Sequence, residues 1–166
     1  MRHRVRAAAL LVRANDGATA PNEILLVKHR SRSRPGNIIW LPPGGGLEAE
    51  DSSIFACAER ETLEECGLTV KTSRIAYVHE FLDQANQIHH VAFYMAVDSS
   101  EGEISLDFLP PDATDALAIL EATWVGREDL AELLVYPEYL KGDDFWQDAA
   151  LNFRQTKYLG QMTKLG

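Results

Sequence analysis

The sequence predicts an α/β (α+β) protein in which helices flank a central mixed β-sheet, built as a single domain over residues 1–166. Three observations lead to this prediction. Segments rich in Val, Leu and Ile alternate with segments that carry helix start and stop signals. The length of 166 residues suits one compact domain. The 46% hydrophobic and 25% charged residues are ordinary values for a globular protein.

The first half of the chain contains three predicted strands. Arg4–Arg13 and Glu23–His29 are rich in aliphatic residues and are separated by a turn-like stretch, and Ile38–Leu41 is a shorter apolar segment. A basic loop precedes the third segment. The run Pro42–Gly46 follows it, and we expect neither a helix nor a paired central strand to continue through these prolines and glycines.

A helix is predicted from about Ser53 to Cys66. Asp51, Ser52 and Ser53 are all suitable N-cap residues, and Gly67 is a suitable residue to end the helix in a left-handed conformation.

Beyond this helix the pattern predicts further strands and two more helices. The expected strands are Leu68–His79, a nearly continuous apolar strand at Ile88–Val97, and the end of Leu117–Val125. Arg127–Val135 and Glu138–Asn152 are predicted to be helical, the second after Pro137.

The net charge of −9 argues against a nucleic-acid polymer as the main partner. The charge is uneven, because the first 41 residues contain eight Lys and Arg residues and only two acidic ones. We therefore expect a small phosphorylated ligand to remain compatible with this protein. No apolar run approaches the roughly 20 residues of a membrane span, and two cysteines without framework spacing suit a cytoplasmic protein. The sequence is also compatible with a homodimer.

Three glutamates are predicted to share one face of the central helix. At 100° per residue, Glu61, Glu64 and Glu65 fall within one arc of about 100°. Like charges at this spacing repel, and they lie in the last turns, where the helix dipole disfavours anions. Acidic residues on a helix are often only a solvated face. Next to a glycine run, however, these three indicate a compensating cation, and clustered carboxylate oxygens are the ligands that Mg²⁺ prefers.

The segment from Gly45 to Leu68 resembles the Nudix box, G-x5-E-x7-R-E-U-x-E-E-x-G-U, in which U is aliphatic. Residues 60–68, RETLEECGL, match its second half except that Thr62 occupies an aliphatic position. The segment 40–45, WLPPGG, and Trp124-Val125 followed by Leu130 are similar to further family segments. The resemblance to MutT-like Nudix hydrolases implies an α/β/α sandwich.

The first half of the box departs from the family pattern. Counting from Gly45 puts the expected glutamate at Asp51, whereas counting back from Arg60 puts it at Ser52, and Glu50 is adjacent. One extra residue where the loop enters the helix would account for the shift.

The resemblance implies divalent-metal-dependent hydrolysis of the pyrophosphate bond of a nucleoside diphosphate derivative by attack of water at phosphorus. The expected substrates are an NTP, an oxidised dNTP, a nucleotide sugar or a compound of the ADP-ribose type. Glu61, Glu64, Glu65 and the carbonyl of Gly44 would bind Mg²⁺ or Mn²⁺, and Arg60 would orient the carboxylates.

The general base is left open among Glu61, Glu64 and an acid of a later loop, for which Asp115 and Glu121 are candidates. In the basic loop, Arg30 and Arg34 are candidates to bind substrate phosphates. Aromatic residues such as Phe81 and Tyr94 could stack on a base, although residues of this kind in strands usually belong to the core.

Two other functions are compatible with the fold. The altered first half of the box favours a nucleotide-sensing module that does not hydrolyse its ligand, although such a module would be expected to lose the box carboxylates. An isopentenyl-diphosphate isomerase-like protein would need Cys and Glu motifs that are not found in this sequence.

Overall fold

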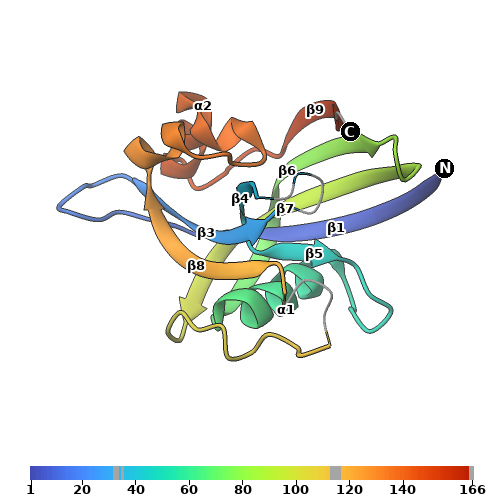
Figure 1. Cartoon of the computed structure of the whole chain (residues 1–166). Helices are drawn as coiled ribbons and strands as arrows, with labels where there is room; N and C mark the ends of the chain where they lie inside the picture. The colour runs from blue at the N-terminus through green and yellow to red at the C-terminus, as the bar shows by residue number, and fades with distance from the viewer. Residues whose placement is uncertain (32–33, 35, 113–116, 165–166) are drawn as a thin grey trace.

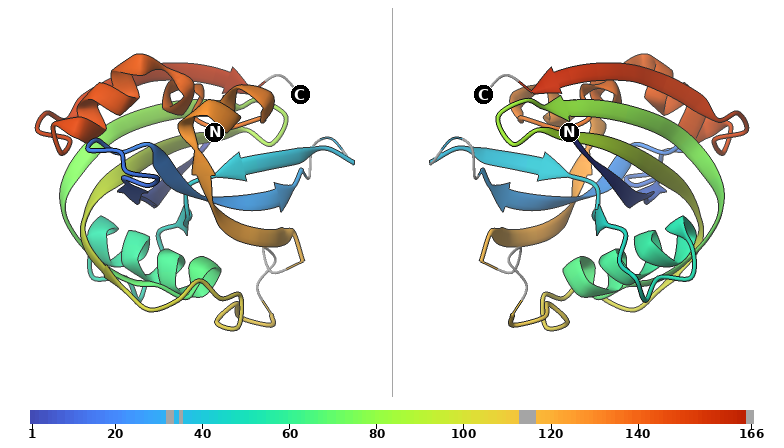
Figure 2. Two further views of the ribbon diagram at one scale, coloured as in Figure 1. Left: turned by 90° about the vertical axis from the view of Figure 1, so that its left-hand side faces the viewer. Right: turned by 90° about the vertical axis from the view of Figure 1, so that its right-hand side faces the viewer.

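The computed structural model describes residues 1–31, 34, 36–112 and 117–164. Its strands form a mixed five-stranded sheet and a second sheet of four strands. Helix α1 (Ile54–Cys66) lies below the sheets, and helix α2 (Asp143–Ala150) lies above them (Figures 1 and 2). The predicted α+β class with a central mixed sheet between helices is therefore confirmed.

The five-stranded sheet has the order β5-β1-β7-β6-β9. Its strands are β5 (Gly44–Gly46), β1 (Arg2–Leu10), β7 (Ile88–Glu101), β6 (Thr69–Asp83) and β9 (Lys157–Lys164). The pairs β1–β7 and β6–β9 are parallel, whereas β1–β5 and β6–β7 are antiparallel. This sheet carries α1 on one face, because α1 contacts β1, β5, β6 and β7.

The second sheet is formed by β2 (Val12–Arg13), β3 (Glu23–Arg30), β4 (Ile38–Leu41) and β8 (Ile119–Gly126). The predicted first strand is therefore divided, since β1 and β2 belong to different sheets and only Leu11 separates them. The Leu11 carbonyl accepts a hydrogen bond from the Leu25 amide at 3.0 Å, which holds the crossing point against β3.

Helix α1 begins and ends as its sequence predicts. The Ser53 hydroxyl accepts a hydrogen bond from the Ala56 amide at 3.0 Å, so Ser53 is the N-cap among the three candidates. Gly67 has φ of 74°, a conformation that favours glycine, and its amide donates to the Leu63 carbonyl. On its side that faces the sheet, the helix packs Cys57 and Ala58 against Ala7.

The two C-terminal helix predictions were too long. Arg127–Glu132 and Glu138–Lys141 are short 3-10 helices (η1 and η2), and only Asp143–Ala150 is α-helical. Gly142, with extended φ and ψ, separates η2 from α2, so a regular helix cannot continue through it. Phe145 and Trp146 of α2 are buried with Leu26 and Tyr77 in the core above the sheets.

Two strands were not expected. The glycine run forms the short strand β5, in which Gly44–Gly46 pairs with Ala8–Arg6 at the edge of the five-stranded sheet. An edge position tolerates this composition because only one side of the strand has to pair. After α2 the chain returns as β9 beside β6. No helix in the described part of the chain has the length and apolar composition needed to cross a membrane.

Phe145 offers a test of the upper core. Its side chain is fully buried against Tyr77, Trp146 and Phe153. We expect Phe145→Ala to lower the free energy of unfolding by about 3–5 kcal/mol, because it removes a buried aromatic ring and leaves a cavity. The matched control is Phe108→Ala, since Phe108 is 55% exposed and should change stability by less than about 1 kcal/mol. Urea denaturation followed by tryptophan fluorescence measures both, and equal losses would contradict this account of the core.

Candidate active site

The predicted acidic face of α1 is turned toward β5 rather than toward open solvent. Glu61 and Glu65 are only 8% and 3% exposed, and Glu64 is half-buried. The Glu65 carboxylate accepts a hydrogen bond from the Gly44 amide at 2.8 Å and lies 3.7 Å from the His29 imidazole of β3. The structure thus brings together the helix, the glycine strand and the end of β3 around these carboxylates.

Glycine is required in β5 because the strand lies very close to its neighbours. A Cβ atom on Gly45 would collide with the Glu61 carboxylate, and one on Gly44 would come within 2.6 Å of the Ala7 carbonyl oxygen. A larger residue at Gly44 would push β5 away from β1, whereas one at Gly45 would displace the Glu61 carboxylate. The glycine run therefore sets the distance between the carboxylates and the edge of the sheet.

Arg60 connects the acidic face to the glycine strand. Its Nη1 atom lies 3.1 Å from Glu61 Oε1 and 3.4 Å from Glu64 Oε2, and its Nη2 atom donates to the Gly46 carbonyl at 3.2 Å. The hydrogen bond to Asp51, supported by the nearby glutamate charges, raises the pKa of Arg60 above its usual value. The guanidinium is thus held as a permanent cation in contact with two of the three glutamates, the position from which it could take the orienting role that the resemblance implies.

Asp51, Ser52 and Glu50 were the three candidates for the position of the first glutamate of the motif, and Asp51 is the one that contacts Arg60. Its two carboxylate oxygens accept hydrogen bonds from Arg60 Nε and Nη2 at 2.8 and 2.9 Å. The bond to Arg60 lowers the pKa of Asp51 to about 2. Glu50 is exposed, and Ser52 begins the turn into the helix. Asp51 is therefore the residue among the three that supports the site, and it acts through Arg60.

Thr62, the other departure from the motif, is fully buried. Its hydroxyl donates to the Ala58 carbonyl at 2.7 Å, one turn earlier in the same helix. Because this bond satisfies the hydroxyl, threonine can occupy the position of an aliphatic residue without an unpaired polar group in the core.

The acidic face has the donor type that suits a hard divalent cation. All three side chains offer carboxylate oxygens, and Glu61 and Glu64 already converge on one cationic group, Arg60 Nη1. Among the residues that the structure describes, no three acidic, imidazole or thiol side chains are grouped so that they could hold a metal ion. The donor type of the three glutamates, rather than an assembled ligand cage, is therefore what suits a hard divalent cation.

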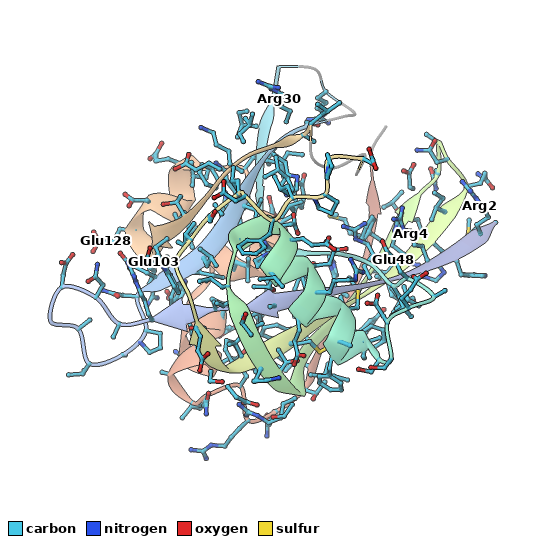
Figure 3. The ribbon with its side chains drawn as sticks, turned by 90° about the horizontal axis from the view of Figure 1, so that it is seen from below. Arg2, Arg4, Arg30, Glu48, Glu103 and Glu128 are labelled. Atoms are coloured by element: carbon cyan, nitrogen blue, oxygen red, sulfur yellow. The ribbon has the colours of Figure 1, made fainter. Side chains whose placement is uncertain are left out.

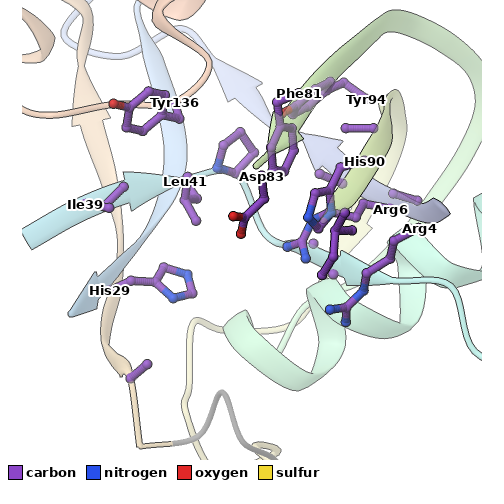
Figure 4. A pocket seen from close by; sticks show the side chains of 18 of the residues that line it. Arg4, Arg6, His29, Ile39, Leu41, Phe81, Asp83, His90, Tyr94 and Tyr136 are labelled. Atoms are coloured by element: carbon purple, nitrogen blue, oxygen red, sulfur yellow. The ribbon is translucent and has the colours of Figure 1, made fainter. Parts of the chain in front are cut away.

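A cavity of about 530 Å³ lies next to this face, between the two sheets. Gly44, Gly45 and His29 line it and also adjoin the glutamates. Figure 4 shows side chains from both sheets turned toward the cavity, among them Arg4 and Arg6 of β1. The sequence interpretation missed these arginines, although every second residue from Arg2 to Arg6 is basic and such residues share one face of a strand.

The aromatic residues divide between cavity and core. Phe81 and Tyr94 line the cavity, and Phe81 stacks on His90 with ring centroids 4.2 Å apart. Burial raises the pKa of Tyr94 to about 12, so its hydroxyl stays protonated. Trp40 belongs to the core above the sheets.

The remaining predicted site residues lie in different places. Glu121 is exposed beside Lys28, on the face of the second sheet opposite to α1, so the structure does not bring it to the glutamates. Arg30 lines the cavity, whereas Arg34 is exposed and its amide hydrogen-bonds to Ser31. In the view from below, α1 lies at the centre with Arg30 above it and Arg4 to its right (Figure 3). Asp115 lies outside the described residues.

The chain matches the NUDIX domain over residues 2–143. A curated relative, described as m7GpppN-mRNA hydrolase NUDT17 of Danio rerio, is 27% identical over 128 residues, which cover 70% of this chain. The match spans only 41% of that longer relative.

Solved structures show the same fold. A MutT NUDIX hydrolase from Burkholderia pseudomallei is 24% identical, with a TM-score of 0.62 over 93% of this chain and 98% of that one. An ADP-ribose pyrophosphatase from Streptococcus suis is 18% identical, with a TM-score of 0.53 over 93% and 98% of the two chains.

The Asp51–Arg60 pair gives a test of how the site is held. We expect Asp51→Asn to lower the free energy of unfolding at pH 7 by about 2 kcal/mol, because a carboxylate with a lowered pKa stabilises the folded state. This stabilisation is fully present above the unfolded pKa of about 4 and is lost as the pH falls toward about 2. The difference between variant and parent should therefore shrink over that range.

Urea denaturation at several pH values measures this difference. Glu50→Gln is the matched control, since it removes the exposed neighbouring carboxylate and should leave stability unchanged. A larger loss for Glu50→Gln than for Asp51→Asn would contradict the assignment of Asp51.

Proposed function

This chain belongs to the NUDIX domain family, and on that premise we propose that it is a hydrolase of small nucleoside diphosphate derivatives that depends on Mg²⁺ or Mn²⁺. The bond to be cleaved is the pyrophosphate P–O bond, and water is the nucleophile. The observation that carries this proposal is the buried set of carboxylates on α1, which adjoins both the glycine strand and an arginine-lined cavity.

The metal-binding role is proposed for Glu61, Glu64 and Glu65, together with the Gly44 carbonyl. Divalent cations bound there would neutralise the phosphate oxygens and activate the water. Arg60 holds Glu61 and Glu64 in position, and its contact with the Gly46 carbonyl ties them to β5. Asp51 in turn fixes Arg60. These residues therefore keep the site in shape before the substrate arrives.

The general base is proposed to be Glu64 or Glu61 rather than an acid from a later loop. Glu64 is the more accessible of the two, because Glu61 is nearly buried against Gly45. A carboxylate that accepts the proton of the attacking water needs contact with solvent, and Glu64 satisfies this requirement best. Glu121 is dropped from this role because it faces Lys28 on the other side of its sheet.

The substrate is proposed to be a free nucleotide, such as an NTP, an oxidised dNTP, a nucleotide sugar or a compound of the ADP-ribose type. The relative from Danio rerio is described as acting on capped mRNA, and a cap is also a nucleoside diphosphate derivative. The net charge of −9 argues against extended contact with an RNA chain. Two buried free thiols, Cys57 and Cys66, support the expected cytoplasmic location.

Replacement of Glu64 tests the catalytic assignment. We expect Glu64→Gln to lower kcat by at least about 100-fold, because general base catalysis typically contributes that much, while the fold is retained. Glu103→Gln is the matched control, since Glu103 is an exposed carboxylate away from α1 (Figure 3) and should leave kcat unchanged. Steady-state rates with Mg²⁺ measure both. A Glu64→Gln variant as active as the parent would rule out this role.

A panel of nucleoside diphosphate derivatives tests the function as a whole. Nucleoside triphosphates, oxidised dGTP, a nucleotide sugar, ADP-ribose and the cap analogue m7GpppG would each be incubated with Mg²⁺ or Mn²⁺. We expect at least one of them to release a nucleoside monophosphate, and chelation by EDTA to stop the reaction. Binding of these compounds without turnover of any would favour the nucleotide-sensing module instead.

A further inference from the structure

The charged side chains that line the cavity between the sheets are mostly positive. Among its described lining residues are three arginines, Arg4, Arg6 and Arg30, but a single carboxylate, Asp83. Both oxygens of Asp83 accept hydrogen bonds from Asn86 in the β6–β7 turn. All three arginines come from the basic first 41 residues of a chain whose net charge is −9, so positive charge is concentrated at this cavity and suits an anionic ligand.

Arg4 and Arg6 lie on the cavity face of β1. Their register neighbours on β7 are His90 and Ala92, and His90 in turn is the neighbour of Phe81 on β6. Arg4, His90 and Phe81 therefore form one row across three strands. Ala7, the residue after Arg6, points to the other face of β1, where it packs against α1. The arginine side chains thus leave the sheet on the side opposite to the helix that carries the glutamates.

No carboxylate in the described part of the chain pairs with either of these arginines. The ion pairs and side-chain hydrogen bonds of the described residues include neither Arg4 nor Arg6, whereas Arg13, Arg60, Arg74 and Arg127 each have an acidic partner. Arg6 is half-buried, so its charge is also partly removed from water. An arginine in this setting is well suited to hold a phosphate through paired N–H donors.

The scissile diphosphate is proposed to lie at the glutamates, on the face of β5 where Gly45 meets Glu61, whereas Arg4 lies against the opposite face of that strand, beside Gly46. The nucleoside itself is uncharged, so a ligand for these arginines needs an anionic group away from the glutamates. We therefore propose that the preferred substrate carries a second anionic group, a phosphate ester on the ribose of its nucleoside, and that Arg4 and Arg6 bind this group in the cavity. This proposal rests on the proposed hydrolysis of nucleoside diphosphate derivatives and specifies which of them the site prefers.

A binding experiment tests the proposal without turnover. The Glu64→Gln protein would be titrated by calorimetry with AMP, adenosine 2′,5′-bisphosphate and adenosine 3′,5′-bisphosphate. We expect one bisphosphate to bind at least about tenfold more tightly than AMP, as one or two charge-assisted hydrogen bonds provide. When Arg4→Gln and Arg6→Gln are added to this protein, the affinity for the bisphosphate should fall to within about twofold of that for AMP. The control Arg2→Gln should keep the tenfold difference, because Arg2 lies on β1 outside the cavity lining.

A kinetic experiment separates this proposal from the proposed function. The kcat/KM for ADP-ribose would be compared with that for 2′-phospho-ADP-ribose and its 3′ isomer in the parent and in the Arg4→Gln/Arg6→Gln variant. We expect the variant to lose activity on the preferred phosphorylated compound and to keep that on ADP-ribose. An equal loss on all compounds would mean that the arginines bind the diphosphate, which overturns the proposal.

The remaining outcomes are also decisive. If neither bisphosphate binds more tightly than AMP, the proposal is wrong whether or not hydrolysis is measured. If no compound is hydrolysed but a bisphosphate is preferred through Arg4 and Arg6, the proposed function fails while the anion site stands.

Discussion

The close contact between the glycine strand β5 and the acidic face of α1 is the constraint on which the site depends. A backbone amide of the strand donates to Glu65, and Gly45 leaves just enough room for Glu61. Buried carboxylates are costly unless they are hydrogen-bonded or paired. The strand supplies backbone donors, Arg60 supplies a charge, and Asp51 holds Arg60 in place. Each group therefore stabilises the next, and together they hold the glutamates close to one another at the edge of the sheet.

Most of α1 could be predicted from its sequence because the determining signals are local. The Ser53 cap, the terminal Gly67 and the spacing of the three glutamates each involve residues about one turn apart. The resemblance to the Nudix box added the roles of these residues. Local patterns also located the central parts of β3, β4, β6 and β7.

Other features depend on contacts between distant parts of the chain. The strand β5 forms because β1 offers it a partner, while its own glycines and prolines argue against a strand. The C-terminal helices were predicted too long because their apolar residues indicate burial, which α2 and the 3-10 segments achieve equally well. The position of Glu121 follows from the pairing of β8 with β3. Asp51 could be distinguished from Glu50 and Ser52 as the residue that supports the site only once the position of Arg60 was known. The cavity lies between the two sheets, and no single segment of the sequence shows how the sheets are placed relative to each other.

The alternation of side chains along β1 has a consequence for how this protein can evolve. Ala7 and Ala9 are buried in the lower core, whereas Arg4 and Arg6 face the cavity. If Arg4 and Arg6 select the ligand as proposed, a mutation at either position would alter which molecule is accepted and leave the contact of Ala7 with α1 intact. Ligand choice and the support of α1 would then be encoded by interleaved positions of a single strand, so selection could change one while it conserves the other.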